Sequence, residues 1–387
     1  MFDLTFLGAS GGPVEGTTCS LLIKPSHIDY NAILSQDLKD QLLCVDAGSG
    51  LHQLSEAIYQ EKALETAKSS LLSLYDDTLP LQDYVKSEVV VPFAGLYHPK
   101  CPTPFSLAWK VLSMINNYLI THPHLDHVAA LALNSAGFDP TEPTKTVIGS
   151  DYTLGALQKY IFNGIIWPNM PSFDVLSLSP REFWLPFNVG DHYKVTMLDL
   201  SHGKINFGHQ AEQQLTTKLT SGHDNPSSPY TSDDTYISSA FLIEYLPGNG
   251  SVLVFGDFES DSVSKQSRNL RIWSSISPLI INHTLRALVL ECSMCTSSSN
   301  SEKLYGHLMP LHLIKELQTL ESQCKHLDPT ISQPLNGLQI IVNHVKESPH
   351  GIHDPRRRVL QSLDTMNEEH GLGVKFSIAL GGVTIRV

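Results

Sequence analysis

The sequence has few cysteines, and they are scattered along the chain. Six occur in 387 residues, at Cys19, Cys44, Cys101, Cys292, Cys295 and Cys324. Small domains held together by disulfides need denser cysteines, so this class is excluded. The C-x-x-C pair at 292 and 295 has no second pair at zinc-finger spacing. We therefore interpret Cys292 and Cys295 as reduced packing residues, with a disulfide or a zinc role as the alternative.

Long apolar runs are also missing. No run approaches the roughly 18 residues that a membrane-spanning helix needs. The first residues, Met1 to Thr5, lack the basic and then apolar pattern of a secretion leader. We therefore expect a soluble, cytoplasmic protein without a membrane partner.

Basic residues are fewer than acidic ones. The chain has 26 Lys and Arg against 39 Asp and Glu, a formal net charge of −13. Because nucleic-acid surfaces need clustered Lys and Arg, we expect no nucleic-acid partner. A hydrophobic content of 41% and a charged content of 17% are typical of a folded chain with a large core.

The most informative segment is a short run rich in histidine. It is Thr121-His122-Pro123-His124-Leu125-Asp126-His127. Side chains alternate along an extended chain, so His122 and His124 point to the same side. If a helix follows, Asp126 and His127 turn toward a neighbouring position. Imidazoles and a carboxylate at this density are typical of a zinc site, and the alternative is a histidine-rich loop without metal.

The rest of the pattern predicts a layered α/β domain. Apolar, often alternating segments are separated by turns and helical stretches, and several end in polar or charged residues. This pattern is typical of two mixed β-sheets packed face to face, with helices outside and a site at one edge. We expect a single domain over residues 1–387, an insertion or dimer-forming segment at 52–112, an amphipathic helix at 151–162 and a long surface loop at 208–234. Strands are expected at 2–7, 19–23, 42–46, 117–121, 194–200, 237–245, 251–255, 287–291, 338–343, 374–380 and 383–387.

Three further metal-binding side chains follow expected strands. His202 closes the strand that begins at 194, Asp257 follows the strand at 251–255, and His344 follows the strand at 338–343. Each one alone is weak evidence, because loop residues of these types often only form hydrogen bonds. His223 is the alternative to His202, although no strand precedes it.

Together these residues complete two ligand sets. We expect one metal at His122, His124 and His202, a second at Asp126, His127 and His344, and Asp257 bridging both. Each metal then keeps an open position for a shared water or hydroxide, and zinc is the ion we expect. Two dications about 3.5–4 Å apart would activate this water for attack at phosphorus. Asp46, at the end of the strand at 42–46, is expected to orient the histidine-rich loop or an imidazole ligand.

The ligand pattern resembles that of the metallo-β-lactamase superfamily. Residues 122–136, His-Pro-His-Leu-Asp-His-Val-Ala-Ala-Leu-Ala-Leu-Asn-Ser-Ala, are similar to the signature of class II cyclic-nucleotide phosphodiesterases of the fungal low-affinity cAMP type. Ala130 stands where that signature has Gly or Ser. Similar landmarks are Leu7 to Pro13, Val45 to Gly48, Ile166 to Pro168, Leu200 to Gly203, Gly256-Asp257, Glu291 to Ser293 and Tyr305 to Leu308. The resemblance spans residues 1–387 and is weakest at 52–112 and 208–234.

The resemblance implies a metallo-β-lactamase-like αββα sandwich and a defined reaction. The enzyme would open 3′,5′-cyclic nucleotides, cAMP and also cGMP, to nucleoside 5′-monophosphates by attack of a metal-bridging hydroxide, and so terminate cyclic-nucleotide signalling. It also implies that His307 assists the departing 3′ oxygen or holds a phosphate oxygen, with Glu291 orienting it. The expected catalytic residues are therefore His307 and Asp126.

Two other functions compete with this one. A tRNA 3′-processing nuclease of the same superfamily would need a basic RNA-binding arm, which we do not find in this acidic sequence. A non-catalytic metal-binding scaffold or nucleotide sensor would bind metal without turnover, but the full set of seven candidate ligands favours an enzyme. A homodimer is also expected.

Overall fold

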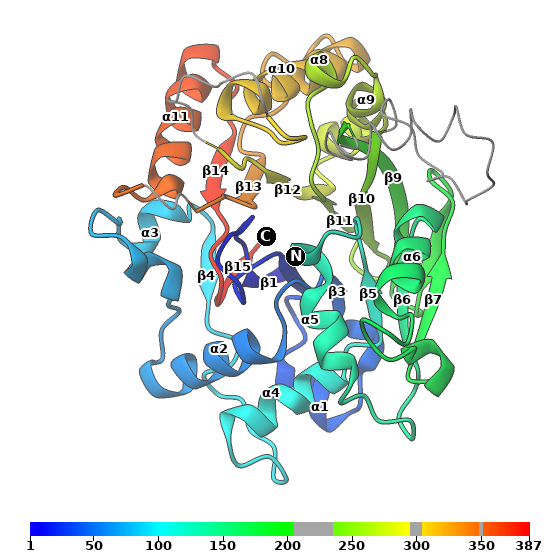
Figure 1. Cartoon of the computed structure of the whole chain (residues 1–387). Helices are drawn as coiled ribbons and strands as arrows, with labels where there is room; N and C mark the ends of the chain where they lie inside the picture. The colour runs from blue at the N-terminus through cyan, green and yellow to red at the C-terminus, as the bar shows by residue number, and fades with distance from the viewer. Residues whose placement is uncertain (205–234, 295–303, 348–350) are drawn as a thin grey trace, which may run out of the picture.

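Two β-sheets packed face to face form the centre of the computed structural model, which describes residues 1–204, 235–294, 304–347 and 351–387 (Figure 1). The eight-stranded sheet has the order β4 (Glu88–Val90), β15 (Val383–Arg386), β1 (Phe2–Gly8), β2 (Ser20–Pro25), β3 (Leu43–Val45), β5 (Asn117–Leu119), β6 (Lys145–Gly149) and β7 (Leu176–Pro180). The seven-stranded sheet has the order β14 (Lys375–Ile378), β13 (Gln339–Asn343), β12 (Leu285–Glu291), β11 (Gly250–Phe255), β10 (Thr235–Tyr245), β9 (Tyr193–Lys204) and β8 (Pro186–Val189). Both sheets mix parallel and antiparallel pairs.

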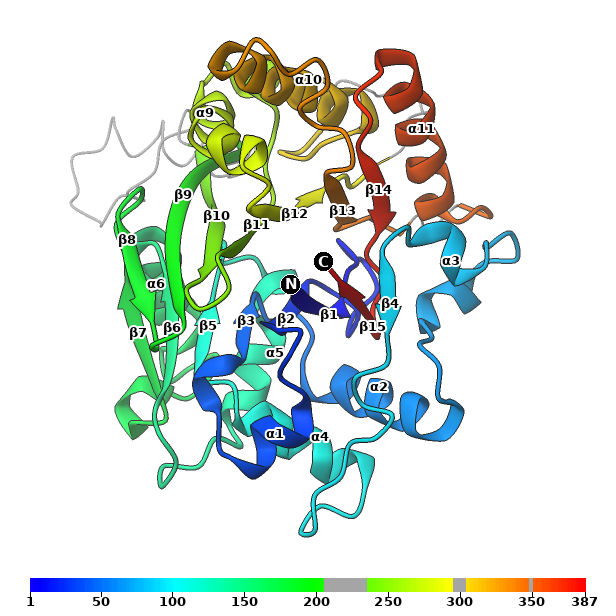
Figure 2. The ribbon, with the colours of Figure 1, turned by 180° about the vertical axis from the view of Figure 1, so that it is seen from behind.

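Helices cover the outer face of each sheet, as Figure 2 shows from behind. The eight-stranded sheet is covered by α1 (Tyr30–Ser35), α2 (Leu51–Leu64), α4 (Pro104–Ser113), α5 (Leu125–Ser135) and α6 (Asp151–Ala156). The seven-stranded sheet is covered by α9 (Arg268–Ile281), α10 (Pro310–Leu327) and α11 (Pro355–His370). Short helices α3 (Leu81–Tyr84) and α8 (Asp261–Ser264) lie in the connections. This is the expected sandwich of two mixed sheets with outer helices, and the predicted fold class is confirmed.

Strand alternation divides the hydrophobic core into separate layers. In β2, Leu21 and Ile23 face the core between the sheets, whereas Leu22 faces the core under α1, α2, α4 and α5. In β3, Leu43 and Cys44 divide in the same way. Both faces of these strands are buried, which explains why they are apolar without interruption.

Segment 52–112 takes part in this layered structure. It supplies the edge strand β4, which pairs with β15, and it supplies α4 and most of α2 to the outer core. The helix expected at 151–162 ends as an α-helix at Ala156 and continues as π-helical turns over Leu157–Ile161. The surface loop expected at 208–234 lies outside the described residues. Among the described helices, none has the length and apolar character needed to cross a bilayer.

Parallel strands bring their carboxyl ends to a common edge. β3 and β5 are parallel neighbours in one sheet, and β11, β12 and β13 are parallel neighbours in the other. The residues that follow these strands therefore meet where the two sheets face each other.

Candidate active site

The histidine-rich loop joins the end of β5 to the start of α5. His122 and His124 lie in the loop, with ring centroids 4.6 Å apart, and His124 is the N-cap residue of α5. Asp126 and His127 occupy the first turn of the helix. The loop approaches Gly48 so closely that a Cβ there would lie 1.8 Å from the Asp126 carbonyl oxygen. Glycine at 48 therefore allows α5 to begin at this point.

His202 reaches the site from a β-bulge, not from a strand end. The sequence interpretation ended the strand before His202, but β9 continues to Lys204. The register with β10 shifts at this point, so that His202 and Gly203 together oppose Tyr236. Such a bulge bends the strand and re-aims its side chains. Gly203, with φ +79°, supplies the left-handed conformation that the bulge requires.

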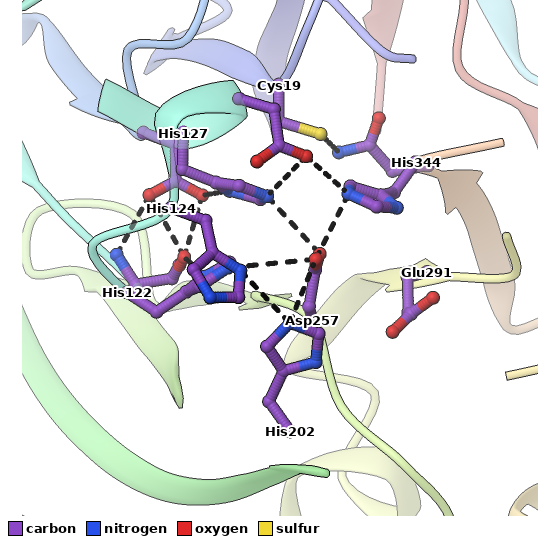
Figure 3. A network of polar contacts seen from close by, with 12 residues as sticks. Cys19, His122, His124, His127, His202, Asp257, Glu291 and His344 are labelled. Atoms are coloured by element: carbon purple, nitrogen blue, oxygen red, sulfur yellow. Dashed lines mark hydrogen bonds and ion pairs between the residues drawn. The ribbon is translucent and has the colours of Figure 1, made fainter. Parts of the chain in front are cut away.

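His344 and Asp257 enter from the seven-stranded sheet. His344 has a left-handed backbone, with φ +60°, and its N–H donates to the carbonyl of Ala9 at 3.0 Å. A non-glycine residue in this conformation is strained, and such strain is common at functional sites. Asp257 lies at the centre of the cluster (Figure 3). Its carboxylate oxygens lie 3.1 Å from His344 Nε2, 3.4 Å from His127 Nε2, 3.6 Å from His202 Nε2 and 3.7 Å from His122 Nε2.

The seven expected ligands converge in two groups that share Asp257. The first ligand group is His122, His124 and His202, and the second ligand group is Asp126, His127 and His344. Within each group, including Asp257, one candidate ligand atom per residue lies within 4.8 Å of all the others. Cys19 also lies within this limit of His127 and His344, although the sequence interpretation did not assign it to the site.

The donor atoms of the site fit divalent cations. His127 Nδ1 donates to Asp46 at 2.7 Å, and His122 Nδ1 lies 3.0 Å from the Thr121 hydroxyl. The Nε2 atoms of both histidines are buried and have no hydrogen-bond partner. A buried, unpaired imidazole nitrogen is costly, and a metal would satisfy it. His202 Nδ1 likewise donates to a neighbour, the carbonyl of Gly306 at 2.9 Å, and His202 Nε2 lies 3.3 Å from His124 Nδ1.

Asp46 has the orienting position expected from the sequence. Its carboxylate accepts from His127 Nδ1 and from both the backbone N–H (2.8 Å) and the hydroxyl (3.0 and 2.9 Å) of Thr121. One carboxylate thus connects the loop and the helix that carry four candidate ligands.

The pKa values separate the two ligand groups. In the first, burial lowers the pKa of all three imidazoles, that of His202 to about 4, because the interior disfavours their charged form. In the second, burial also opposes charge on His127 and His344. The surrounding carboxylates, with Asp257 the strongest and Asp126 beside it, together outweigh burial; they raise the pKa of His127 and raise that of His344 to about 9. Without metal, protons on the second group therefore balance the buried carboxylates, and a divalent ion would replace those protons.

Glu291 is the centre of a second buried network. It accepts from His307 Nδ1 at 3.1 Å, from the Ser293 hydroxyl at 2.5 Å and from the backbone N–H of Phe258 at 2.8 Å. Ser293 in turn accepts from His344 Nδ1 at 2.8 Å. Glu291 therefore contacts one candidate ligand through Ser293 and contacts His307 directly, and its role in orienting His307 stays a prediction.

Two residues near the cluster were missed by sequence reasoning. The Lys346 ammonium lies 2.8 Å from His307 Nε2, on the opposite side of the ring from Glu291. The ring of Tyr236 lies edge-on to His124, with centroids 5.1 Å apart. Neither residue belongs to a motif. Lys346 lies two residues after His344, and Tyr236 directly precedes the strand expected at 237–245. His223, the alternative to His202, lies outside the described residues.

The fold and the site together define the class of protein. Two mixed sheets with outer helices and a His/Asp cluster at their edge form the metallo-β-lactamase fold. A metallo-β-lactamase fold protein from Bacillus subtilis, YhfI, superposes on the whole chain with a TM-score of 0.50 and 15% identity, and its own chain is covered completely.

Within this class, the chain belongs to the family of class-II cAMP phosphodiesterases, whose model matches residues 32–382. It is 41% identical to a 3′,5′-cyclic-nucleotide phosphodiesterase of Candida albicans, with 100% of both chains covered. It is 30% identical to 3′,5′-cyclic-nucleotide phosphodiesterase 1 of Saccharomyces cerevisiae, covering 100% of this chain and 99% of that one. The crystal structure of unliganded yeast PDE1 matches with a TM-score of 0.79 and 27% identity, over 100% and 99% of the two chains. The family resemblance and the enzyme class predicted from the sequence are confirmed.

Proposed function

We propose that the chain hydrolyses 3′,5′-cyclic nucleotides to nucleoside 5′-monophosphates at this cluster, with two divalent ions that we expect to be zinc. The observation that carries the proposal is the pair of ligand groups sharing Asp257. Five imidazoles and two carboxylates suit zinc, which favours nitrogen and oxygen donors. The curated relatives in Candida albicans and Saccharomyces cerevisiae are named for this reaction.

The protein's own residues prepare the site before any ion or substrate arrives. The first ligand group is neutral because it is buried. It presents a lone pair at His122 Nε2, which has no hydrogen-bond partner, and one at His202 Nε2, because His202 donates through Nδ1. Asp46, Gly306 and Ser293 each accept a hydrogen bond from the Nδ1–H of a histidine and so fix its tautomer. When bound, two ions would supply a hydroxide nucleophile near neutral pH and positive charge beside phosphorus.

The nucleotide specificity is proposed to include cGMP as well as cAMP. Relatives from Dictyostelium discoideum named as cAMP/cGMP phosphodiesterases match at 24% and 23% identity. Tyr236, beside His124, offers an aromatic face near the cluster on which a nucleobase would stack.

One preparation tests the proposal. Elemental analysis should find two divalent ions per chain, and the same sample should convert cAMP and cGMP to 5′-monophosphates while leaving precursor tRNA intact. Metal without turnover would favour the scaffold, and cleavage of precursor tRNA would favour the nuclease.

Variants separate the roles of the residues. His124→Ala and Asp257→Ala should each abolish turnover and lower the bound metal, whereas His307→Ala should lower the rate with metal retained. His326→Ala, an exposed histidine on α10, is the matched control and should change neither. If His307→Ala strips the metal, the proposed division of roles is wrong.

A further inference from the structure

Glu291, His307 and Lys346 form a chain of hydrogen bonds that leads out of the ligand cluster. His307 Nδ1 lies 3.1 Å from both carboxylate oxygens of Glu291, and His307 Nε2 lies 2.8 Å from the Lys346 ammonium. The His307 ring stacks on that of His344, with centroids 5.1 Å apart, and lies 4.9 Å from that of His202. The chain therefore borders both ligand groups.

The chemistry of Glu291 and Lys346 determines which nitrogen of the His307 ring carries a hydrogen. A carboxylate only accepts, so His307 Nδ1 carries the hydrogen that Glu291 receives. A lysine ammonium only donates, so His307 Nε2 accepts through its lone pair. Both nitrogens of His307 are then engaged, and neither has an N–H left for a substrate. The Lys346 ammonium keeps two further N–H donors.

The backbone around Lys346 is firmly held. The N–H of Lys346 donates to the carbonyl of Ser293 at 3.0 Å, and the N–H of Glu347 donates to the carbonyl of Gly12 at 2.9 Å. The Glu347 carboxylate is buried, pairs with the buried Arg356 and accepts from the Tyr75 hydroxyl at 2.6 Å. Lys346 itself is only partly buried. A cation whose backbone is held in this way can meet a bound anion without much loss of conformational entropy.

We propose that Lys346 is a catalytic residue that donates hydrogen bonds to an oxygen of the scissile phosphate, and that His307 is a positioning residue that aims it. The contact is electrostatic, and the ammonium keeps its proton throughout. Charge-assisted hydrogen bonds of this kind strengthen as negative charge accumulates in the transition state. The inference rests on the proposed phosphodiesterase function, and it transfers the direct contact with substrate from His307 to Lys346.

The test compares Lys346→Met, Lys346→Arg and the exposed control Lys375→Met on β14. Each is assayed on cAMP and on bis(p-nitrophenyl) phosphate, with bound metal measured on the same sample. Lys346→Met should lower kcat by about 10²-fold or more, the usual effect of losing one such donor. Metal content should match wild type, Lys346→Arg should recover part of the rate, and Lys375→Met should behave as wild type.

A double variant tests the positioning role. If His307 acts through Lys346, His307→Ala combined with Lys346→Met should cost no more than Lys346→Met alone. Additive losses would overturn the positioning role. A Lys346→Met enzyme within twofold of the control, or one that has lost metal, would overturn the catalytic role. If wild type cleaves bis(p-nitrophenyl) phosphate but not cAMP, the proposed substrate is wrong. The role of Lys346 can then still be tested by the rates of the variants on this diester.

Discussion

Asp46 shows how one carboxylate prepares a ligand set before metal binds. It follows β3, has a left-handed backbone with φ +54°, and accepts from both Thr121 and His127. Its oxygens fix the loop and also the tautomer that leaves His127 Nε2 free for a metal. Outer contacts of this kind commonly change metal affinity by about 10–100-fold.

Asp46→Asn should therefore weaken metal binding by about 10–100-fold while the fold is retained. An amide keeps only one accepting oxygen and adds two donors, so it cannot serve both Thr121 and His127. Competition with a chromophoric chelator measures the affinity, and the exposed Asp191→Asn provides the control. Unchanged affinity in Asp46→Asn would show that the tautomer of His127 is fixed by other contacts.

At the scale of residues, the sequence predicted which side chains cluster as candidate ligands, but it did not predict the residues that surround them. At residues 122–127, histidine and aspartate side chains follow a strand at short spacing. Such a group of possible ligands can be recognised from the sequence alone. Lys346 is different, because its partner His307 lies 39 residues earlier and only the fold brings them together. Cys19, which directly precedes β2, was not recognised as a possible ligand because a buried thiol looks like any packing residue.

At the scale of elements, two glycines allow β9 and the segment before α10 to touch. Gly306 has φ +82°, and a Cβ there would lie 2.4 Å from the carbonyl oxygen of His202. Gly203, in the bulge, would in turn meet Gly306 Cα at 2.9 Å. The sequence shows both glycines but does not predict their contact, because the bulge in β9 depends on how β9 pairs with β10.

Gly306→Ala should disrupt the site more than it destabilises the fold. The new Cβ must push His202 and His307 apart, so we expect lower metal occupancy together with a loss of kcat. Gly371→Ala separates this effect from backbone strain, because Gly371 also has positive φ, +63°, but has no atom within 4 Å of the added Cβ. The control should lose stability alone, by about 1–2 kcal/mol. Similar metal content in the two variants would contradict the close-contact argument.

Glu61 on α2 makes the stability of the fold depend on pH. Its carboxylate is buried and accepts from the N–H of Phe93 at 2.6 Å, which ties α2 to the chain after β4. Burial raises the pKa of Glu61 to about 7. The folded state then holds a proton that the unfolded state releases near pH 4.5, so stability falls as pH rises between about 4.5 and 7.

Glu61→Gln should remove this pH dependence. The amide oxygen still accepts from Phe93, so the variant should equal wild type near pH 4 and exceed it by up to about 3 kcal/mol above pH 7. Denaturant unfolding at several pH values measures the difference, with the exposed Glu56→Gln of the same helix as control. A constant difference across this range would argue against a proton on Glu61.

At the scale of the whole molecule, the cluster joins the two sheets. His122, His124, Asp126 and His127 come from the eight-stranded sheet's side, and His202, Asp257 and His344 from the seven-stranded sheet's side. The sandwich was predictable because buried strands and turn residues have clear patterns. The pairing order was not, because β1 and β15 pair across almost the whole chain. The expected homodimer stays a prediction.

Because the candidate ligands come from both sheets, removal of metal should loosen the sandwich as a whole. An ion bound only by the folded state adds about 2.7 kcal/mol per site at a free concentration of 100 times its Kd. For a chain of this size, chelation should lower Tm by several degrees for two sites, and returning zinc should restore both Tm and turnover. Asp257→Ala supplies the control, since its Tm should barely respond to chelator. Equal shifts in wild type and Asp257→Ala would place the stabilising ion elsewhere, because a metal that bridges the sheets cannot be held without the carboxylate shared by both ligand groups.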